Sequence, residues 1–234
     1  MDLQPPSIAP GTDVASQTPT AAHLPAVGSS LALLRQHTRI EHARLEDRLD
    51  IFTRLQGRDE YRALLIRMYG LYDPLEARLL EAGHRHALPL DLAARRKAPL
   101  LERDLAVLGL DPVARAAIPR CAALPVLDSA AAALGCLYVL EGATLGGQLI
   151  ARHLDRHLGI GTDTGGAFFT AYGERVGAMW RTVCAVLAAD TCAPGEEEAM
   201  IGAARATFEA FEAWLLQAGA PWCTAVPAAI ATPS

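Results

Sequence analysis

Residues 135–153 of this 234-residue chain read GCLYVLEGATLGGQLIARH, with three glycines in the middle of the stretch. Long apolar runs and the absence of proline from 126 to 193 predict a helix here. A glycine inside a helix loses about 0.5–1 kcal/mol relative to alanine, so Gly142, Gly146 and Gly147 together cost about 2–3 kcal/mol. We therefore expect something to approach the backbone closely at this point.

Gly142 and Gly146 are four residues apart and share one face of the predicted helix. In one interpretation, this smooth face packs closely against a neighbouring helix. In the other, the helix kinks over a flat ligand, and the glycines leave room for it. The first helix of the chain favours the ligand.

The first predicted helix runs from Leu31 to Phe52, with the serines at 29–30 available as its N-cap. Its apolar stripe passes through Thr38 and His42, so His42 is expected to point inward. His37 shares its face with charged side chains and is expected to be solvated. A lone histidine on an apolar face is more often a hydrogen-bonded core residue than a ligand, so both interpretations of His42 stay open at this point.

Two charged residues flank His42 at helical spacing. Arg35 lies seven residues before it, two turns away on the same face, or about 10 Å by helical rise. Glu46 follows four residues later, where its carboxylate could accept from one imidazole nitrogen and orient the ring, as carboxylates commonly do for metal-binding histidines. Alternatively, Glu46 pairs with a nearby arginine on the surface.

The rest of the chain also shows helical patterns. A second helix begins near Arg58 and is expected to kink at Pro74. Residues 92–110 predict an amphipathic helix whose basic start, 95–97, is solvated, whereas 155–166 form a glycine-rich loop. Two further helices are expected toward the C-terminus, and no segment alternates as a strand does. The predicted fold class is an all-α bundle.

Composition indicates a soluble, cytoplasmic protein. The net charge is -5, and the 21 Lys and Arg residues form no basic stripe, which argues against nucleic-acid binding. The five cysteines are odd in number and never spaced C-x-x-C, so neither a disulfide framework nor a zinc site is indicated. The apolar stretch 129–140 falls short of the roughly 18 residues that a membrane span needs.

The expected domain organisation has three parts. Residues 1–27 contain several prolines and neither Lys nor Arg, and they are expected to form a disordered extension without the features of a secretory signal. Residues 28–220 form a single helical domain that binds the ligand. Residues 221–234 form a loose tail.

Three motifs together resemble the heme oxygenase family, particularly its bacterial branch, from about residue 30 to residue 217. They are LRQHTRIEHARLE at 34–46, the tyrosine pair Tyr69 and Tyr72, and YVLEGATLGG at 138–147. The resemblance implies a helical heme oxygenase-like domain that holds heme between a proximal helix and a kinked, glycine-containing distal helix.

The resemblance also assigns roles to individual residues. His42 is implied as the proximal ligand of the heme iron. Gly142 and Gly146 are implied as the catalytic distal face that touches the porphyrin, together with Gly147. A neutral histidine ligand leaves the iron able to bind O2, and bare glycine backbone neither blocks the ring nor occupies the metal.

Basic and hydroxyl side chains complete the implied site. Arg35 matches a residue that contacts a heme propionate, and Arg181 matches a second one across an alignment gap. Tyr72 corresponds to a catalytic tyrosine of the distal water network. Ala143 stands where the mammalian-type pattern has an aspartate, so proton delivery relies on Tyr72 with water or on a substitute residue.

The implied activity is cleavage of heme, as both substrate and cofactor, by O2 to biliverdin, Fe2+ and CO. The chain has no flavin or nicotinamide fingerprint, so an external ferredoxin or flavoprotein reductase is expected to supply electrons. A biliverdin acceptor such as a bacteriophytochrome is a further expected partner. The alternative functions are a non-catalytic heme carrier or sensor, a structural adaptor, and a ferritin-like di-iron enzyme. A di-iron enzyme needs two Glu-x-x-His motifs, and only residues 81–84 match, with Gly83 inside the motif.

Overall fold

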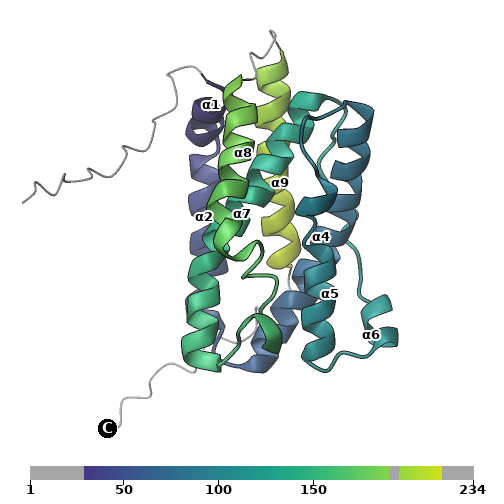
Figure 1. The fold of residues 1–234 in the computed structure, drawn as a ribbon, viewed down its shortest axis with the longest axis vertical. Helices are drawn as coiled ribbons and strands as arrows, with labels where there is room; N and C mark the ends of the chain where they lie inside the picture. Colours follow the sequence, from purple (N-terminus) through teal and green to yellow (C-terminus); the bar gives the residue numbers. More distant parts are fainter. Residues whose placement is uncertain (1–28, 190–194, 218–234) are drawn as a thin grey trace, which may run out of the picture.

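The computed structural model describes residues 29–189 and 195–217, and every regular element in these ranges is helical (Figure 1). The predicted all-α class is confirmed. The extension predicted at 1–27 and the tail predicted at 221–234 lie outside the described residues. The α-helices are α1 Ser30–His37, α2 Arg39–Leu49, α3 Ile51–Arg54, α4 Arg58–Arg85, α5 Ala98–Val107, α6 Pro112–Ala116, α7 Ala130–Leu158, α8 Val176–Ala189 and α9 Glu196–Leu215, with 3-10 turns η1 Ala93–Arg95, η2 Thr162–Thr164 and η3 Gly173–Arg175.

Helix α7 is the central element, and it runs the length of the bundle beside α9 (Figure 1). Ser129 caps its start by accepting from the Ala132 amide at 3.1 Å. Its end is set by Gly159, which adopts the left-handed conformation with φ 61°. Near its start, Gly135 allows the close approach of α9, because a Cβ there would overlap the Met200 carbonyl.

Helix α7 is long and apolar enough to cross a membrane, contrary to the expectation from 129–140 alone. However, 67% of its most apolar 18-residue window is buried inside the bundle. In this structure α7 is therefore the core helix of the bundle, and its apolar side chains contact other helices.

Helix α4 continues through Pro74, and the loop after α6 uses the carbonyl that this proline frees. Proline has no N–H to donate to the carbonyl four residues earlier. That carbonyl, on Gly70, instead accepts from the Cys121 amide at 2.9 Å. The proline thus leaves a docking point for the segment that leads to α7.

The prediction of one helix from Leu31 to Phe52 is wrong, because the chain breaks twice. At Thr38, the hydroxyl donates to the Leu34 carbonyl at 2.7 Å, a contact that bends helices, and the backbone leaves helical geometry. At Asp50, the backbone is left-handed with φ 40°, which aspartate tolerates better than most residues. Helix α2 is therefore a separate segment of eleven residues.

Candidate functional site

Helix α2 is held on α9 by both apolar and charged contacts. Leu45 and Leu49 are its buried residues. Glu212 of α9 accepts from Nε of Arg44 at 2.8 Å and also pairs with Arg48. These contacts fix the face of α2 that carries His42.

The prediction that His42 points into the core is wrong. Its side chain is 57% exposed. Leu45 and Leu49, which share the predicted stripe with His42, are buried, so His42 alone leaves this stripe within the same helix. One edge of the His42 ring still packs against Phe208, with centroids 5.8 Å apart. The core-histidine interpretation is therefore excluded.

The expected partner of the imidazole is present. Nδ1 of His42 lies 3.3 Å from Oε2 of Glu46, one turn later on α2. A carboxylate at Nδ1 fixes the ring and leaves Nε2 as the nitrogen that can bind a metal. His37, which was expected to be solvated, is half-buried at the end of α1.

Two of the four glycines in α7, Gly142 and Gly146, lie on a face that no neighbouring helix packs against closely. No heavy atom of another element lies within 4 Å of the position that a Cβ would take at Gly146. At Gly142, the nearest such atom is Cη2 of Trp180, at 4.0 Å. Close packing of a neighbouring helix therefore does not explain these two glycines. Beside them, Leu145 and Leu149 are 40% and 58% exposed, although both are large apolar residues.

Gly147 has different surroundings. It is buried, and a Cβ there would lie 3.3 Å from Cδ1 of Phe169. The 165–172 segment that carries this ring is held by Asp104, which accepts from the amides of Ala167 at 2.9 Å and Phe168 at 2.7 Å. The structure thus brings Gly142 and Gly146, but not Gly147, to the open face.

A pair of aromatic rings lies on each side of the two glycines along α7. Toward the C-terminus, the Phe52 ring meets the His153 ring edge-on, with centroids 5.3 Å apart. Toward the N-terminus, the rings of Tyr138 and Trp180 lie 5.8 Å apart. Sequence reasoning missed Trp180 as a site residue, because nothing in its spacing relates α8 to Gly142.

The two predicted arginines lie at the periphery. Arg35 is exposed on α1, and its charge acts on the hydroxyl of Tyr138. Burial raises the pKa of Tyr138, whereas a hydrogen bond with Thr38 and the charge of Arg35 lower it. Arg181 is exposed on α8, with its guanidinium against Gly177 one turn earlier. Arg35 is thus close to the aromatic end of the glycine face.

Tyr72 is a core residue, only 2% exposed. Its ring lies edge-on between Phe168 and Phe211, with centroids 5.1 and 5.7 Å away. Burial, followed by the charges of Glu76 and Glu141, raises the pKa of the Tyr72 hydroxyl far above its ordinary value. The hydroxyl therefore stays protonated and can act only as a neutral donor or acceptor.

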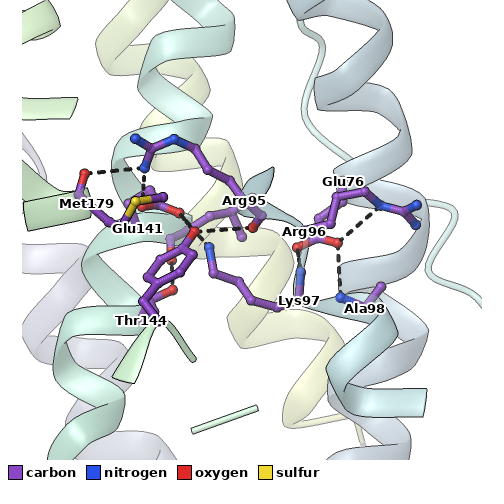
Figure 2. A network of polar contacts seen from close by, with 10 residues as sticks. Glu76, Arg95, Arg96, Lys97, Ala98, Glu141, Thr144 and Met179 are labelled. Carbon is purple, nitrogen blue, oxygen red and sulfur yellow. Dashed lines mark hydrogen bonds and ion pairs between the residues drawn. The ribbon is translucent and has the colours of Figure 1, made fainter. Parts of the chain in front are cut away.

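The basic run 95–97 was predicted to be solvated, and this is wrong. The side chains of Arg95 and Lys97 are 6% and 2% exposed, and both pair with Glu141, whose side chain is 1% exposed. Figure 2 shows the 95–98 segment between Glu141 of α7 and Glu76 of α4. The three basic residues look like a solvated helix start because no local pattern signals an acidic partner more than forty residues later.

Glu76 completes this buried cluster. Its carboxylate accepts from the amides of Lys97 at 2.7 Å and Ala98 at 3.0 Å, so one helix supplies the N-terminal cap of another. Burial raises the pKa of Glu76, and these two hydrogen bonds lower it. Burial lowers the pKa of Lys97, while the charge of Glu141 raises it.

The exposed residues suit a flat apolar ligand that carries a metal. His42 offers one free nitrogen, Gly146 offers bare backbone, and Leu149 offers apolar contact area. Helices α2 and α7 both pack against α9, and α3, which follows α2, contacts α7. The histidine and the glycines therefore belong to neighbouring parts of the bundle.

Comparisons with known proteins agree with this chemistry. A model of the heme oxygenase family matches residues 29–217 of the chain. A protein named heme oxygenase, from Xanthomonas campestris pv. campestris (strain 8004), is 52% identical over 60 residues. That stretch is 26% of this chain and 32% of the relative, so the alignment covers less than a third of either protein.

Proposed function

The chain belongs to the heme oxygenase family, and on this premise we propose that it cleaves heme, with O2 and a reductant, to biliverdin, Fe2+ and CO. The observation that carries the proposal is the glycine face of α7, where nothing lies within 4 Å of a Cβ at Gly146 and Trp180 comes no closer than 4.0 Å to a Cβ at Gly142. Heme supplies both the redox-active iron and the ring that is cleaved. The chain supplies a histidine, bare backbone and buried polar groups around it.

His42 is the proposed proximal iron ligand. Its exposure, and the carboxylate of Glu46 at Nδ1, support this role, because the ring is oriented while Nε2 remains available. A neutral imidazole binds iron without the electron push that a thiolate gives. Phe208 limits rotation of the ring from the side of α9.

The distal face is proposed at Gly142 and Gly146. Side chains there would obstruct attack on the ring, and glycine removes them. Gly147 contributes through close packing on Phe169, which holds this part of α7 in place. Exposed Leu149 adds apolar contact area.

Arg35 and Arg181 are the proposed partners of the heme propionates, since both are exposed and cationic. Tyr72 is the proposed tyrosine of the distal proton network. Its raised pKa keeps the hydroxyl protonated, so it can hold a water and pass a hydrogen bond, but it does not act as a base. With Ala143 in place of an aspartate, water must carry protons past this position.

The proposed setting is a cytoplasmic enzyme that receives electrons from a separate ferredoxin or flavoprotein reductase. Biliverdin would pass to an acceptor protein, for which a bacteriophytochrome is the proposed example. The proposal includes no bound flavin or nicotinamide.

The test is one reductive turnover of the hemin-loaded protein. We expect the heme absorption to decay and a biliverdin spectrum to replace it, with the product identified by chromatography. Stable heme under O2 and reductant would instead indicate a carrier or sensor of the same fold, the alternative function.

His42→Ala tests the ligand assignment, and His37→Ala is the matched control on the preceding helix. We expect the first variant to lose histidine-ligated ferric heme and turnover, and the second to retain both. Unchanged heme spectra in His42→Ala would refute the assignment.

A further inference from the structure

Beside the glycine face, the buried Arg95 bridges α7 and α8, through an ion pair to α7 and a hydrogen bond to α8. Arg95 Nη1 donates to Oε2 of Glu141 at 2.6 Å, and the same nitrogen donates to the Met179 carbonyl at 3.3 Å (Figure 2). Glu141 directly precedes Gly142 on α7, and Met179 directly precedes Trp180 on α8.

Gly142 and Trp180, the residues that follow Glu141 and Met179 in the chain, lie close to each other at the proposed distal face. Cη2 of Trp180 lies 4.0 Å from the position of a Cβ on Gly142. A shift of α8 along or away from α7 would change this separation. A rotation of α7 about its axis would turn Gly142 and Gly146 toward or away from the ligand.

The rest of the cluster holds Glu141 from other sides. Oε1 of Glu141 accepts from Lys97 Nζ at 2.5 Å and from the Tyr172 hydroxyl at 2.8 Å. Tyr172 has a left-handed backbone with φ 66°, unusual for a tyrosine, at the turn that leads into α8. The carboxylate therefore has no freedom to turn without breaking several contacts.

Stability alone is a poor reason to keep such a cluster. Removing charges from water is costly, and well-packed apolar residues often replace a buried ion pair without loss of stability. In some proteins, buried polar pairs are instead retained because they specify how the elements around them are arranged.

We propose that Arg95 and Glu141 are positioning residues, which lock the rotation of α7 and its spacing to α8 so that Gly142 faces the heme beside Trp180. This inference rests on the proposed function. Lys97 serves mainly to neutralise the carboxylate, since no contact links its ammonium group to α8 among the described residues. Arg95 therefore affects the distal face in a way that Lys97 does not.

The experiment compares Arg95→Met with Lys97→Met, which each remove one cation from the same carboxylate. The first readout needs no turnover: the pH midpoint of the transition between water and hydroxide on ferric heme, followed by absorption. We expect the midpoint of Arg95→Met to differ from that of Lys97→Met by about half a pH unit or more. The second readout is the ratio of biliverdin isomers, which we expect to change only in Arg95→Met.

Arg95→Lys keeps the charge balance and serves if Arg95→Met fails to fold. The lysine side chain is shorter than that of arginine, so we expect it to pair with Glu141 but not to reach the Met179 carbonyl, and to shift both readouts. Equal midpoints and equal isomer ratios in the Arg95 variants and Lys97→Met would overturn the inference and leave the proposed function intact. A parent protein that binds no heme would overturn both.

Discussion

Substituting Gly146 by alanine tests whether this face of α7 binds a ligand or packs against another helix. A ligand face predicts a more stable apoprotein, and a packing face predicts a less stable one. No heavy atom of another element lies within 4 Å of a Cβ built at Gly146. Gly146→Ala should therefore stabilise the apoprotein by about 0.5–1 kcal/mol, the helix-propensity gain. For a domain of this size, that gain raises Tm by roughly 2–4 °C per kcal/mol.

The same position should respond to a larger side chain in the opposite sense once heme is added. Gly146→Leu places a branched side chain where the porphyrin is proposed to lie, so we expect heme affinity to fall by about tenfold or more, equal to about 1.4 kcal/mol. Hemin titration followed by absorption measures the affinity, and thermal unfolding measures stability.

Gly202 of α9 supplies the control, since it is also exposed and helical with no atom within 4 Å of a Cβ. Gly202→Ala and Gly202→Leu should leave heme affinity unchanged, and the alanine variant should gain similar stability. Loss of stability in Gly146→Ala, or parental heme affinity in Gly146→Leu, would refute the assignment of this face to the ligand.

Three further predictions concern buried and paired charges. Glu46→Ala should lower the iron–histidine stretching frequency in resonance Raman spectra, because Nδ1 of His42 loses its carboxylate; an unchanged frequency would contradict the contact. Burial raises the folded pKa of Glu76, so its contribution to stability is fully present below its ordinary pKa and is lost as pH rises through the folded pKa. Glu76→Gln should remove this dependence in urea unfolding between about pH 4 and pH 7; a parallel profile would show that Glu76 does not cause it. Glu212→Ala should cost about 1 kcal/mol, because its arginine partners are half-exposed, and should speed hydrogen exchange in α2 more than in α4; equal changes in both helices would contradict the tether.

The helical class was predictable from the sequence, since periodic apolar stripes report burial directly. The capping of α1 by Ser29, which accepts from the Ala32 amide at 3.3 Å, also follows from local signals. The family resemblance rested on motifs at 34–46 and 138–147, and the family match over 29–217 confirms it.

The errors arose where distant residues decide the outcome. His42 lies on the same unbroken helix as the buried Leu45 and Leu49, yet its side chain is 57% exposed, and its ring meets α9 through Phe208. Arg95 and Lys97 look solvated in any local window, yet Glu141 from another helix pairs with both. No spacing rule connects residues that far apart in the chain.

The candidate site was predictable in its residue types more than in its geometry. The pairing of His42 with Glu46 follows from i, i+4 spacing and is present. The separation of Gly147 from Gly146 follows from their being adjacent on a helix, about 100° apart, but which of them faces Phe169 depends on the 165–172 segment.

A structure of the hemin complex tests the central claim most directly. We predict iron bonded to Nε2 of His42, with the porphyrin against the backbone of Gly142 and Gly146. Heme bound elsewhere on the bundle, or a His42 ring turned away from the metal, would contradict the account.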